Sequence, residues 1–439
     1  MGKSKWTRRE FVKRAGQTTG AVAIGLSFAD FLAACGGGTA TPSTSGLSGN
    51  VEIFSWWTGA GEKDGLAELF RIYNVHNPNV HIINATVAGG AGTNAKAVLK
   101  TRMEGGQPPD SFQVHAGQEL ISTWVKAGKM EPITSIWASE GWDQYMPKDL
   151  KDIVSANGQV WSVPVNVHRG NALWYNKKLL DSNNITPPVT MDDFLQAMST
   201  LKGKVQAPLA LGSNGNWEVQ MLLENNIAAA GGPDFYKAVM SGQASFTDDK
   251  VKQALTWIKQ MLAYVNSDHT NLGWDDAAKR LIAGTSVFTI MGDWAKGYFT
   301  ANNWTANTDF GAAASPGTKG LYMIVCDTFG LPKGAPHRDN AVAWLKVCGS
   351  NEGQTAFNPK KGSIPARTDV SASVFDPIAQ QFMAEFKTDA LIPSSAHGSA
   401  TPDAFASAVN DEMGQFVQAK DVNKTAANLQ KLSDEFLKS

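Results

Sequence analysis

The chain has 439 residues, of which 39 are basic and 40 acidic, so its formal net charge at neutral pH is −1. A charge this balanced, without a basic patch, excludes a nucleic-acid-binding protein. The sequence contains no metal clip (CxxC, HExxH), nucleophile elbow (GxSxG) or phosphate loop (GxxxxGK[ST]), so we expect neither a metal nor another cofactor. About 390 residues follow the N-terminal segment, which is too many for one ordinary core and predicts two domains.

Residues 1–35 have the pattern of a twin-arginine signal peptide rather than of a folded element. Arg8 and Arg9 precede an apolar stretch that is too short and too Gly-interrupted to span a membrane. It ends in Leu-Ala-Ala-Cys, which resembles a bacterial lipobox and marks Cys35 for lipidation; a plain secretory signal with an incidental cysteine is the alternative. Residues 36–50 predict a flexible tether. We therefore expect an exported protein, lipid-anchored to the outer face of the cytoplasmic membrane.

The first globular stretch is expected to be a buried strand that starts at Val51 and runs into Trp56, Trp57, a Gly-rich turn and Glu62. Open α/β sheets bind ligands at the carboxyl ends of their strands, so aromatic rings and an acid at this point indicate the floor of a ligand site. The alternative is that both tryptophans belong to the core. The chain has 14 tryptophans against seven tyrosines, and flat apolar rings suit the faces of sugars.

Strands and helices are predicted to alternate up to residue 127, which indicates an α/β fold with a parallel sheet and helical crossovers. The expected strands cover residues 80–87 and 111–115, and the expected helices cover 65–73, 93–103 and 117–127. Side chains alternate along a strand, so Gln113 and His115 should point to the same side.

A different pattern begins in the extended run that passes through Asn166 and His168, where we expect the chain to cross into a second, mostly helical domain. Trp274 is expected at the start of a helix in this domain. A later strand ends in Asp293 and Trp294, again an acid and a tryptophan at a strand-to-helix junction.

Asp327 interrupts an apolar, extended run over residues 321–331, and a carboxylate there is costly to bury without a partner. We therefore expect Asp327 to be functional and the chain to return to the first domain at this point. A turn that carries Lys361 is expected over residues 357–365, and a later loop of small residues presents His397.

Two cysteines follow Cys35. Cys326 lies in an apolar, strand-like run and Cys348 lies near the end of a predicted helix. In an oxidising compartment they could form a disulfide, which would stabilise the fold by about 3 kcal/mol. Two independent buried thiols are the alternative.

Six segments occur together in the order of one known family: the lipobox, EIFSWW, PPDSFQVH, SVPVNVHRGNALWYN, MGDWA and DTFGLPKG. In these segments the chain resembles the bacterial extracellular solute-binding proteins of carbohydrate-uptake ABC importers, of the maltose-binding-protein type. The likeness is greatest to the glucose-binding members. It implies an α/β, two-lobed periplasmic-binding-protein fold (type II) with a multi-segment hinge. The lobes would comprise residues 51–166 with 326–364, and residues 167–325 with 365–439.

The resemblance also implies a monomer that captures a monosaccharide between its lobes and delivers it to a permease with a cytoplasmic ATPase. Glucose is the expected sugar, with galactose or mannose as alternatives. Matching the segments places the sugar-binding positions at Trp56 or Trp57, Glu62, Gln113, His115, Asp327 and Lys361 in the first lobe, and at Trp274, Trp294 and His397 in the second. These side-chain types suit hexose hydroxyls, which need both donors and acceptors. Adjacent strand residues face opposite ways, so only one of the two tryptophans should contact the sugar, and we expect Trp57.

Simpler roles are open for several of these residues. Glu62 could be a partner for the dipole of the helix that follows it, and Asp293 could cap a helix. Ordinary surface positions are the alternative for the other polar candidates, namely His115, His397 and Lys361. Asn166 and His168 belong either to the hinge or to the site.

A secreted glycoside hydrolase is the second class of function, because Trp-rich clefts with paired acids also describe those enzymes. Glu62, Asp293 and Asp327 are the acids that such an enzyme could use. The lipid tether and the order of the matching segments favour a binding protein, so we expect no catalytic residue.

Overall fold

The computed structural model describes residues 46–438. The expected signal peptide, the lipidation site Cys35 and most of the expected tether lie outside the described residues. The first strand begins at Gly49, so it includes the last two residues of that tether. Within residues 46–438, no helix has the length and apolar character that a membrane span requires.

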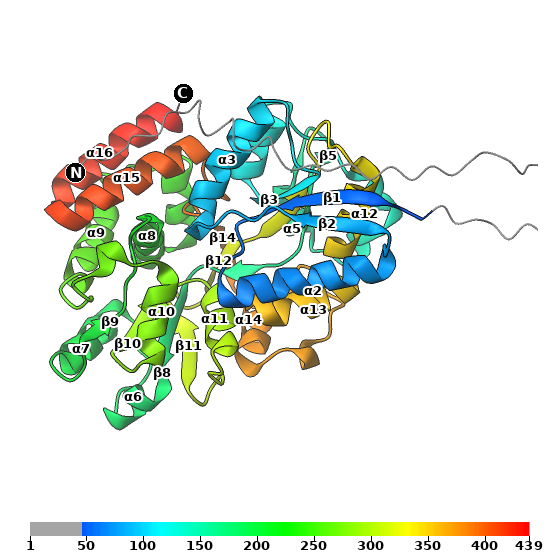
Figure 1. Ribbon diagram of the computed structural model, residues 1–439. Coiled ribbons are helices and arrows are strands. Elements are labelled where there is room, and N and C mark those ends of the chain that lie inside the picture. Colours follow the sequence, from blue (N-terminus) through cyan, green and yellow to red (C-terminus); the bar gives the residue numbers. More distant parts are fainter. Residues whose placement is uncertain (1–45, 439) are drawn as a thin grey trace, which may run out of the picture. The chain divides into compact units, whose positions relative to one another are not determined.

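The larger of the two main sheets has five strands in the order β2-β1-β3-β13-β6 (Figure 1). β1 pairs in parallel with β2 and β3, whereas β13 is antiparallel to both β3 and β6. All five residues of β3 are buried, as expected for a central strand that is covered on both faces. The strands are β1 (Gly49–Phe54), β2 (Val80–Asn84), β3 (Ser111–His115), β6 (Ser162–Pro164) and β13 (Asp327–Gly330).

The second main sheet has four strands in the order β11-β8-β10-β9, with β8 antiparallel to both of its neighbours. Its strands are β8 (Ala172–Asn176), β9 (Ala207–Leu209), β10 (Ser286–Ile290) and β11 (Phe310–Ala314). A third, smaller sheet contains β7 (His168–Arg169), β12 (Leu321–Val325) and β14 (Ala390–Pro393). β4 (Ser155–Ala156) and β5 (Gln159–Val160) form a separate pair.

Two extended segments connect the five-stranded sheet with the three-stranded sheet. β6 leads through residues 165–167 into β7, and β12 leads through Cys326 into β13. A bridge between Val167 and Ile364 adds a third chain segment at the same place. These are the positions at which the sequence predicts the crossings between lobes; the bounds of the lobes themselves stay a prediction.

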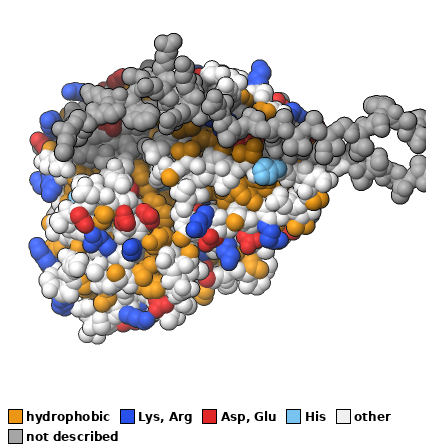
Figure 2. Space-filling view, in the orientation of Figure 1, with side chains coloured by type: hydrophobic (Ala, Val, Ile, Leu, Met, Phe, Trp, Pro, Cys, Tyr) orange, Lys and Arg blue, Asp and Glu red, His pale blue; other side chains and the backbone are white. Residues whose placement is uncertain are grey.

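Helices cover the main sheets (Figure 1). Up to residue 301 they are α2 (Ala60–His76), α3 (Thr93–Glu104), α4 (Thr134–Ser139), α5 (Lys148–Ile153), α6 (Lys177–Ser182), α7 (Met191–Leu201), α8 (Trp217–Met240), α9 (Asp249–Met261), α10 (Trp274–Ile282) and α11 (Trp294–Ala301). The later ones are α12 (Arg338–Gly349), α13 (Asn351–Lys361), α14 (Pro377–Thr388), α15 (Asp403–Ala419) and α16 (Val422–Phe436). Two large clusters of buried apolar side chains form the core, one around Ile53 and Leu69 and the other around Leu255 and Phe288. On the face shown in Figure 2, basic and acidic side chains are interspersed.

Two local predictions are wrong. Residues 357–361 are not a turn, because Ser350 caps α13 and the helix continues until Gly362 ends it with a φ of 95°. Residues 119–125 form a π-helix, η2, rather than an α-helix; the wider turn is visible in the hydrogen bond from the Lys126 nitrogen to the Ile121 carbonyl oxygen.

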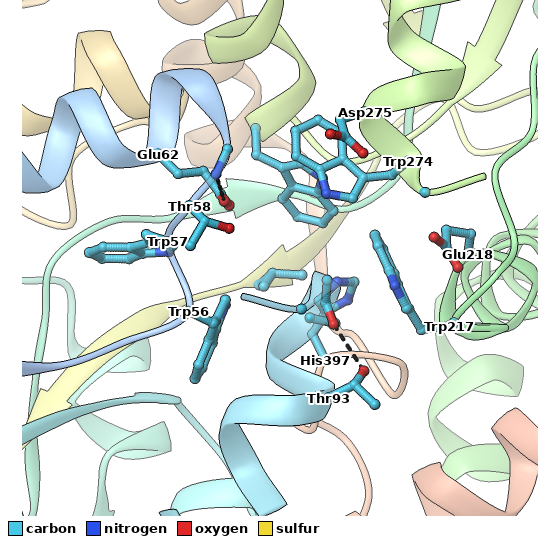
Figure 3. Close-up of a pocket in the computed structure, with 18 of the residues that line it drawn as sticks. Trp56, Trp57, Thr58, Glu62, Thr93, Trp217, Glu218, Trp274, Asp275 and His397 are labelled. Carbon is cyan, nitrogen blue, oxygen red and sulfur yellow. Dashed lines mark hydrogen bonds between the residues drawn. The ribbon is translucent and has the colours of Figure 1, made fainter. Parts of the chain in front are cut away.

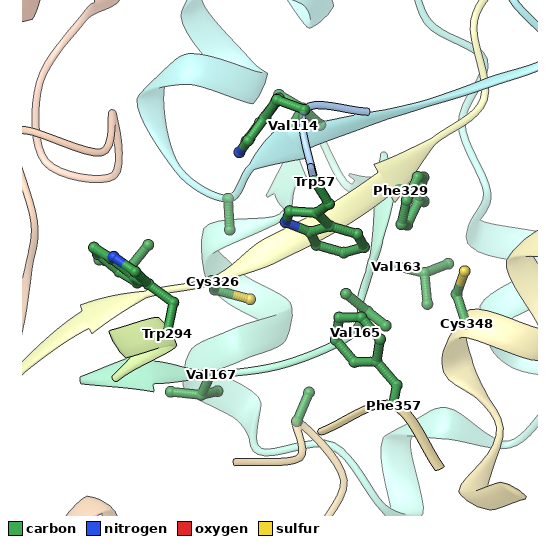
Figure 4. Packing of buried hydrophobic residues seen from close by; sticks show 14 of the residues in the cluster. Trp57, Val114, Val163, Val165, Val167, Trp294, Cys326, Phe329, Cys348 and Phe357 are labelled. Atoms are coloured by element: carbon green, nitrogen blue, oxygen red, sulfur yellow. The ribbon is translucent and has the colours of Figure 1, made fainter. Parts of the chain in front are cut away.

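Of the two alternatives for Cys326 and Cys348, independent buried thiols is the one observed, since both cysteines are free and buried. Cys326 joins β12 to β13, and its Sγ lies 3.7 Å from the backbone oxygen of Asp327, whereas Cys348 lies in the last turn of α12. The two thiols occupy different elements of the apolar core (Figure 4). Burial raises the pKa of both, so they stay protonated.

Candidate functional site

A cavity of about 550 Å³ lies where β1, β3 and β10 end (Figure 3). Sites for small molecules usually have about 300–1,000 Å³. Ten of the predicted ligand-binding residues line this cavity: Trp56, Trp57, Glu62, His115, His168, Trp274, Trp294, Asp327, Lys361 and His397. The other three, Gln113, Asn166 and Asp293, do not line it but bind side chains that do.

Trp56 and Trp57 divide between the cavity and the core. The ring of Trp56 faces the cavity, with its centroid 4.9 Å from that of His115 (Figure 3). Trp57 is 1% exposed, and its ring packs against Phe329 and Phe357 at centroid distances of 5.6 and 5.0 Å (Figure 4). The expectation that Trp57 is the ring facing the cavity is therefore wrong, because its ring lies between β13 and α13.

Two glycines of the loop at residues 89–92 allow indole rings to approach the cavity. A Cβ at Gly90 would lie 2.8 Å from Nε1 of Trp217, and a Cβ at Gly92 would lie 2.9 Å from the ring of Trp56. Gly92 also has a φ of 77°, which favours glycine. This loop therefore positions the indole lining of the cavity.

Asp327 accepts several buried hydrogen bonds below the cavity. Gln113 Nε2 and Asn166 Nδ2 each donate to its carboxylate over 2.8 Å, and His168 Nε2 lies 3.2 Å from Oδ2. Burial favours the neutral acid, but the hydrogen bond from His168 and the charge of Lys361 outweigh it and hold the pKa of Asp327 well below its usual range. The carboxylate is therefore ionised and fixed, which suits an acceptor for ligand hydroxyl groups.

His168 is held on its other side by Asp293, which is hydrogen-bonded to Nδ1. Burial and the charge of Lys361 disfavour the protonated ring. The charge and hydrogen bond of Asp293, together with the hydrogen bond to Asp327, outweigh both and raise the pKa of His168. Asp293 thus orients the cavity residue His168. The alternative role of Asp293 as a helix cap is not observed, since its side chain makes no capping hydrogen bond to α11.

His115 is oriented by an acid that the sequence analysis did not single out. Its Nδ1 lies 2.7 Å from Oε2 of Glu119, and Lys96 Nζ lies 2.7 Å from the same oxygen. Burial opposes ionisation of Glu119, but the charges of Lys96 and His115 outweigh it and lower the pKa of Glu119 to about 2. His115 is buried, so the surface alternative is wrong.

Lys361 is buried against Glu62 and two indoles. Its Nζ lies 3.1 Å from Oε1 of Glu62, 5.6 Å from the ring centroid of Trp57 and 5.9 Å from that of Trp294. Glu62 also accepts a hydrogen bond from the Gly59 nitrogen over 3.2 Å. Glu62 therefore both caps α2 and holds the lysine, so its two interpretations are compatible.

The loop that carries His397 is fixed by Glu224 of α8, a second acid that sequence reasoning missed. Ser394 Oγ donates to Oε1 of Glu224 over 2.8 Å, and the nitrogens of Ser395 and Ala396 donate to Oε2 over 2.6 and 3.0 Å. Burial raises the pKa of Glu224 to about 7 despite these bonds.

His397 itself is enclosed by aromatic rings. The centroids of His115, Trp217 and Trp294 lie 5.5, 5.5 and 5.0 Å from that of His397. Burial and the neighbouring His115 lower the pKa of His397 well below its ordinary value, so the ring is neutral. A neutral imidazole offers one donor and one acceptor to a ligand.

Sequence reasoning missed part of the lining: Thr58, Thr93, Asn94, Asn214, Trp217, Glu218 and Asp275. Trp217 and Glu218 begin α8, so a tryptophan and an acid again lie together at the start of a helix. The same pairing in the sequence predicts Trp294 as a site residue. That signal was present in the sequence. Among residues 46–438, no cluster of His, Cys, Asp and Glu could hold a metal ion.

Glu218 should make stability depend on pH. Burial, with a smaller contribution from the charge of Asp275, raises its pKa from 4.5 to about 8. The folded protein therefore binds this proton where the unfolded chain has lost it, and stability falls as pH rises from about 4.5 to 8. Urea denaturation of the ligand-free Glu218→Gln variant should show a gain in the free energy of unfolding over wild type. This gain should be larger at pH 8 than at pH 5 by roughly 1–3 kcal/mol. The same gain at both pH values would contradict this.

Comparisons with known proteins place the chain in a family. The model of the bacterial extracellular solute-binding protein family matches residues 49–355, so the chain belongs to this family. An ABC transporter extracellular-binding protein of Pyrococcus horikoshii, PH1214, is 40% identical over 403 residues, which is 90% of each chain. A probable sugar-binding periplasmic protein of Mesorhizobium japonicum is 33% identical over 394 residues, 88% of this chain and 93% of the relative.

The bacterial solute receptor AcbH, whose structure was solved, superposes with a TM-score of 0.78 at 19% identity. The match covers 89% of this chain and 98% of the receptor. This likeness confirms the predicted two-lobed, type II periplasmic-binding-protein fold. The family consists of solute-binding proteins rather than enzymes, so the glycoside hydrolase alternative is set aside.

Proposed function

We propose that the protein captures a sugar in the cavity and delivers it to an ABC permease that is driven by a cytoplasmic ATPase. The carrying observation is the ionised Asp327, which three neighbours fix in the cavity that the ring of Trp56 also lines. Fixed acceptors suit hydroxyl groups, and indole rings suit the apolar face of a sugar ring. The name of the Mesorhizobium relative supports the same class of ligand.

A monosaccharide, with glucose before galactose or mannose, is the expected ligand. Isothermal titration calorimetry of residues 46–439 with these three sugars and maltose tests this proposal. Binding of at least one monosaccharide, together with a higher melting temperature, is expected. If no sugar binds, the proposed function is wrong. Turnover of an aryl glucoside would contradict a role in binding alone.

We also propose that the protein is a monomer with the two lobes predicted from the sequence. Residues 51–166 with 326–364 would form one lobe, and residues 167–325 with 365–439 the other. Strand membership supports this division, because β1, β2, β3, β6 and β13 all fall within the first set. Sedimentation of the purified protein with and without sugar tests the oligomeric state.

Lipid anchoring at Cys35 is a further part of the proposal. The Cys35→Ser variant of the full chain should lose incorporation of labelled fatty acid and move from the membrane fraction to the soluble exported fraction. Its sugar affinity should be unchanged, because the site begins at Trp56, beyond the expected tether. Equal membrane association of variant and wild type would contradict anchoring at this residue.

A further inference from the structure

Glu218 is a buried acid whose carboxylate has no partner within residues 46–438. Its side chain is 1% exposed and lines the cavity, and neither of its side-chain oxygens accepts a hydrogen bond. A place in the first turn of α8 gives it the favourable end of a helix dipole. That position still leaves both oxygens without a donor, and a buried acceptor without a donor costs about 1–3 kcal/mol.

The other charged groups on this side of the cavity are also acids. Asp275, in the first turn of α10, lies at the exposed rim, and Figure 3 shows it between Glu62 and Glu218 along the cavity wall. Within the described lining, Lys361 is the single lysine or arginine, and Glu62 already holds it at 3.1 Å. The wall formed by Glu218 and Asp275 is therefore acidic, and within the described lining no lysine or arginine is left to balance the charge that Glu218 takes when it ionises.

Asp327, another acid of the cavity lining, differs from Glu218 because its charge is fully compensated. Asp327 has Gln113, Asn166 and His168 as partners and lies in the field of Lys361. A neutral sugar could bind beside Asp327 without leaving a charge unpaired. Beside Glu218 a neutral sugar supplies no positive charge, so it leaves this carboxyl in the protonated form that burial favours.

We propose that the transported ligand is an amino sugar whose protonated amine binds Glu218, with Asp275 at the rim above it. This inference rests on the proposed function and narrows its substrate class. An ammonium group would supply both the donors and the positive charge that this wall lacks, and a desolvated pair of opposite charges attracts strongly. A hydroxyl group would supply a donor without a charge. Trp217, which lines the cavity beside Glu218 (Figure 3), offers a ring face to the same cation.

The test is calorimetry at pH 7 on the mature protein with matched pairs of sugars. Glucose is compared with 2-amino-2-deoxyglucose and 6-amino-6-deoxyglucose, and galactose with 2-amino-2-deoxygalactose. At least one amino sugar should bind about tenfold or more tightly than its hydroxyl parent, a difference of about 1.4 kcal/mol. Its N-acetyl derivative, which has lost the charge, should lose this preference.

Two variants separate the roles of neighbouring acids. Glu218→Gln should reduce the ratio of amino-sugar to parent affinity to about one, since the amide keeps the shape without the charge. Asp276→Asn is the matched control, because Asp276 is the next acid of α10, is exposed and does not line the cavity; it should keep the full ratio. Melting curves confirm that each variant folds.

The outcomes distinguish this inference from the function on which it rests. Neutral sugars that bind as tightly as their amino counterparts would overturn the inference and leave the sugar-binding function standing. A preference that survives in Glu218→Gln would also overturn it. If neither class of sugar binds the wild-type protein, the proposed function and the inference both fail.

Discussion

The Asp327→Asn variant is expected to bind its sugar at least about 100-fold more weakly than wild type, a loss of about 3 kcal/mol. Asparagine has nearly the same shape, but it removes the charge and turns one acceptor into a donor. That amide would face Gln113, Asn166 or His168, which now donate to the carboxylate or lie beside it. Calorimetry with the best-binding sugar measures the loss, and an unchanged affinity would remove Asp327 from the site.

The matching alanine variant is expected to lose stability as well. Asp327→Ala leaves the buried donors of Gln113 and Asn166 without an acceptor, and breaking a buried charged network in this way costs about 3–5 kcal/mol. From the sequence alone one expects the alanine variant to fold normally, because the partners of Asp327 are not visible there. Asp110→Asn is the control, since Asp110 is a buried acid that does not line the cavity and whose partners, Glu52 and His337, do not line it either.

The second large effect separates two neighbouring rings. Trp57→Ala should lower the free energy of unfolding by about 3–5 kcal/mol, because its ring is fully enclosed by Phe329 and Phe357. Trp56→Ala should instead lower sugar affinity by about tenfold or more, since its ring faces the cavity. Urea denaturation and calorimetry on both variants measure the two properties.

The expected result for the Trp pair is a crossed pattern, with the larger stability loss in one variant and the larger affinity loss in the other. Trp56 is also mostly buried, so some loss of stability is expected in its variant too. Equal changes of both properties in the two variants would show that the rings have the same role.

The pattern of the sequence predicted three strands of the first sheet, and pattern together with the family resemblance predicted ten residues of the cavity lining. Alternating apolar runs predicted β1, β2 and β3, and acids or tryptophans at strand ends predicted Glu62 and Trp294. These predictions succeed because residues that end neighbouring strands come together at one edge of a sheet. Pro359 favours the turn that the sequence predicts over residues 357–365, but the caps at Ser350 and Gly362 outweigh this local preference and the helix continues.

The supporting residues could not be predicted in the same way. Glu119 contacts His115 from the next turn, but Asp293 reaches His168 from 125 positions away and Glu224 reaches Ser394 from 170 positions away. Such pairs depend on how the elements pack, which periodicity does not specify. The direction in which the Trp57 ring points also depends on this packing, because the ring contacts Phe357 of α13.

The indole lining has a practical consequence. Besides Trp57, whose ring lies in the core, four of the 14 tryptophans line the cavity, namely Trp56, Trp217, Trp274 and Trp294. Indole emission shifts when water beside the ring is displaced, so the protein carries its own optical reporter of occupancy. A titration followed by intrinsic fluorescence can therefore screen many sugars on small amounts of unlabelled protein.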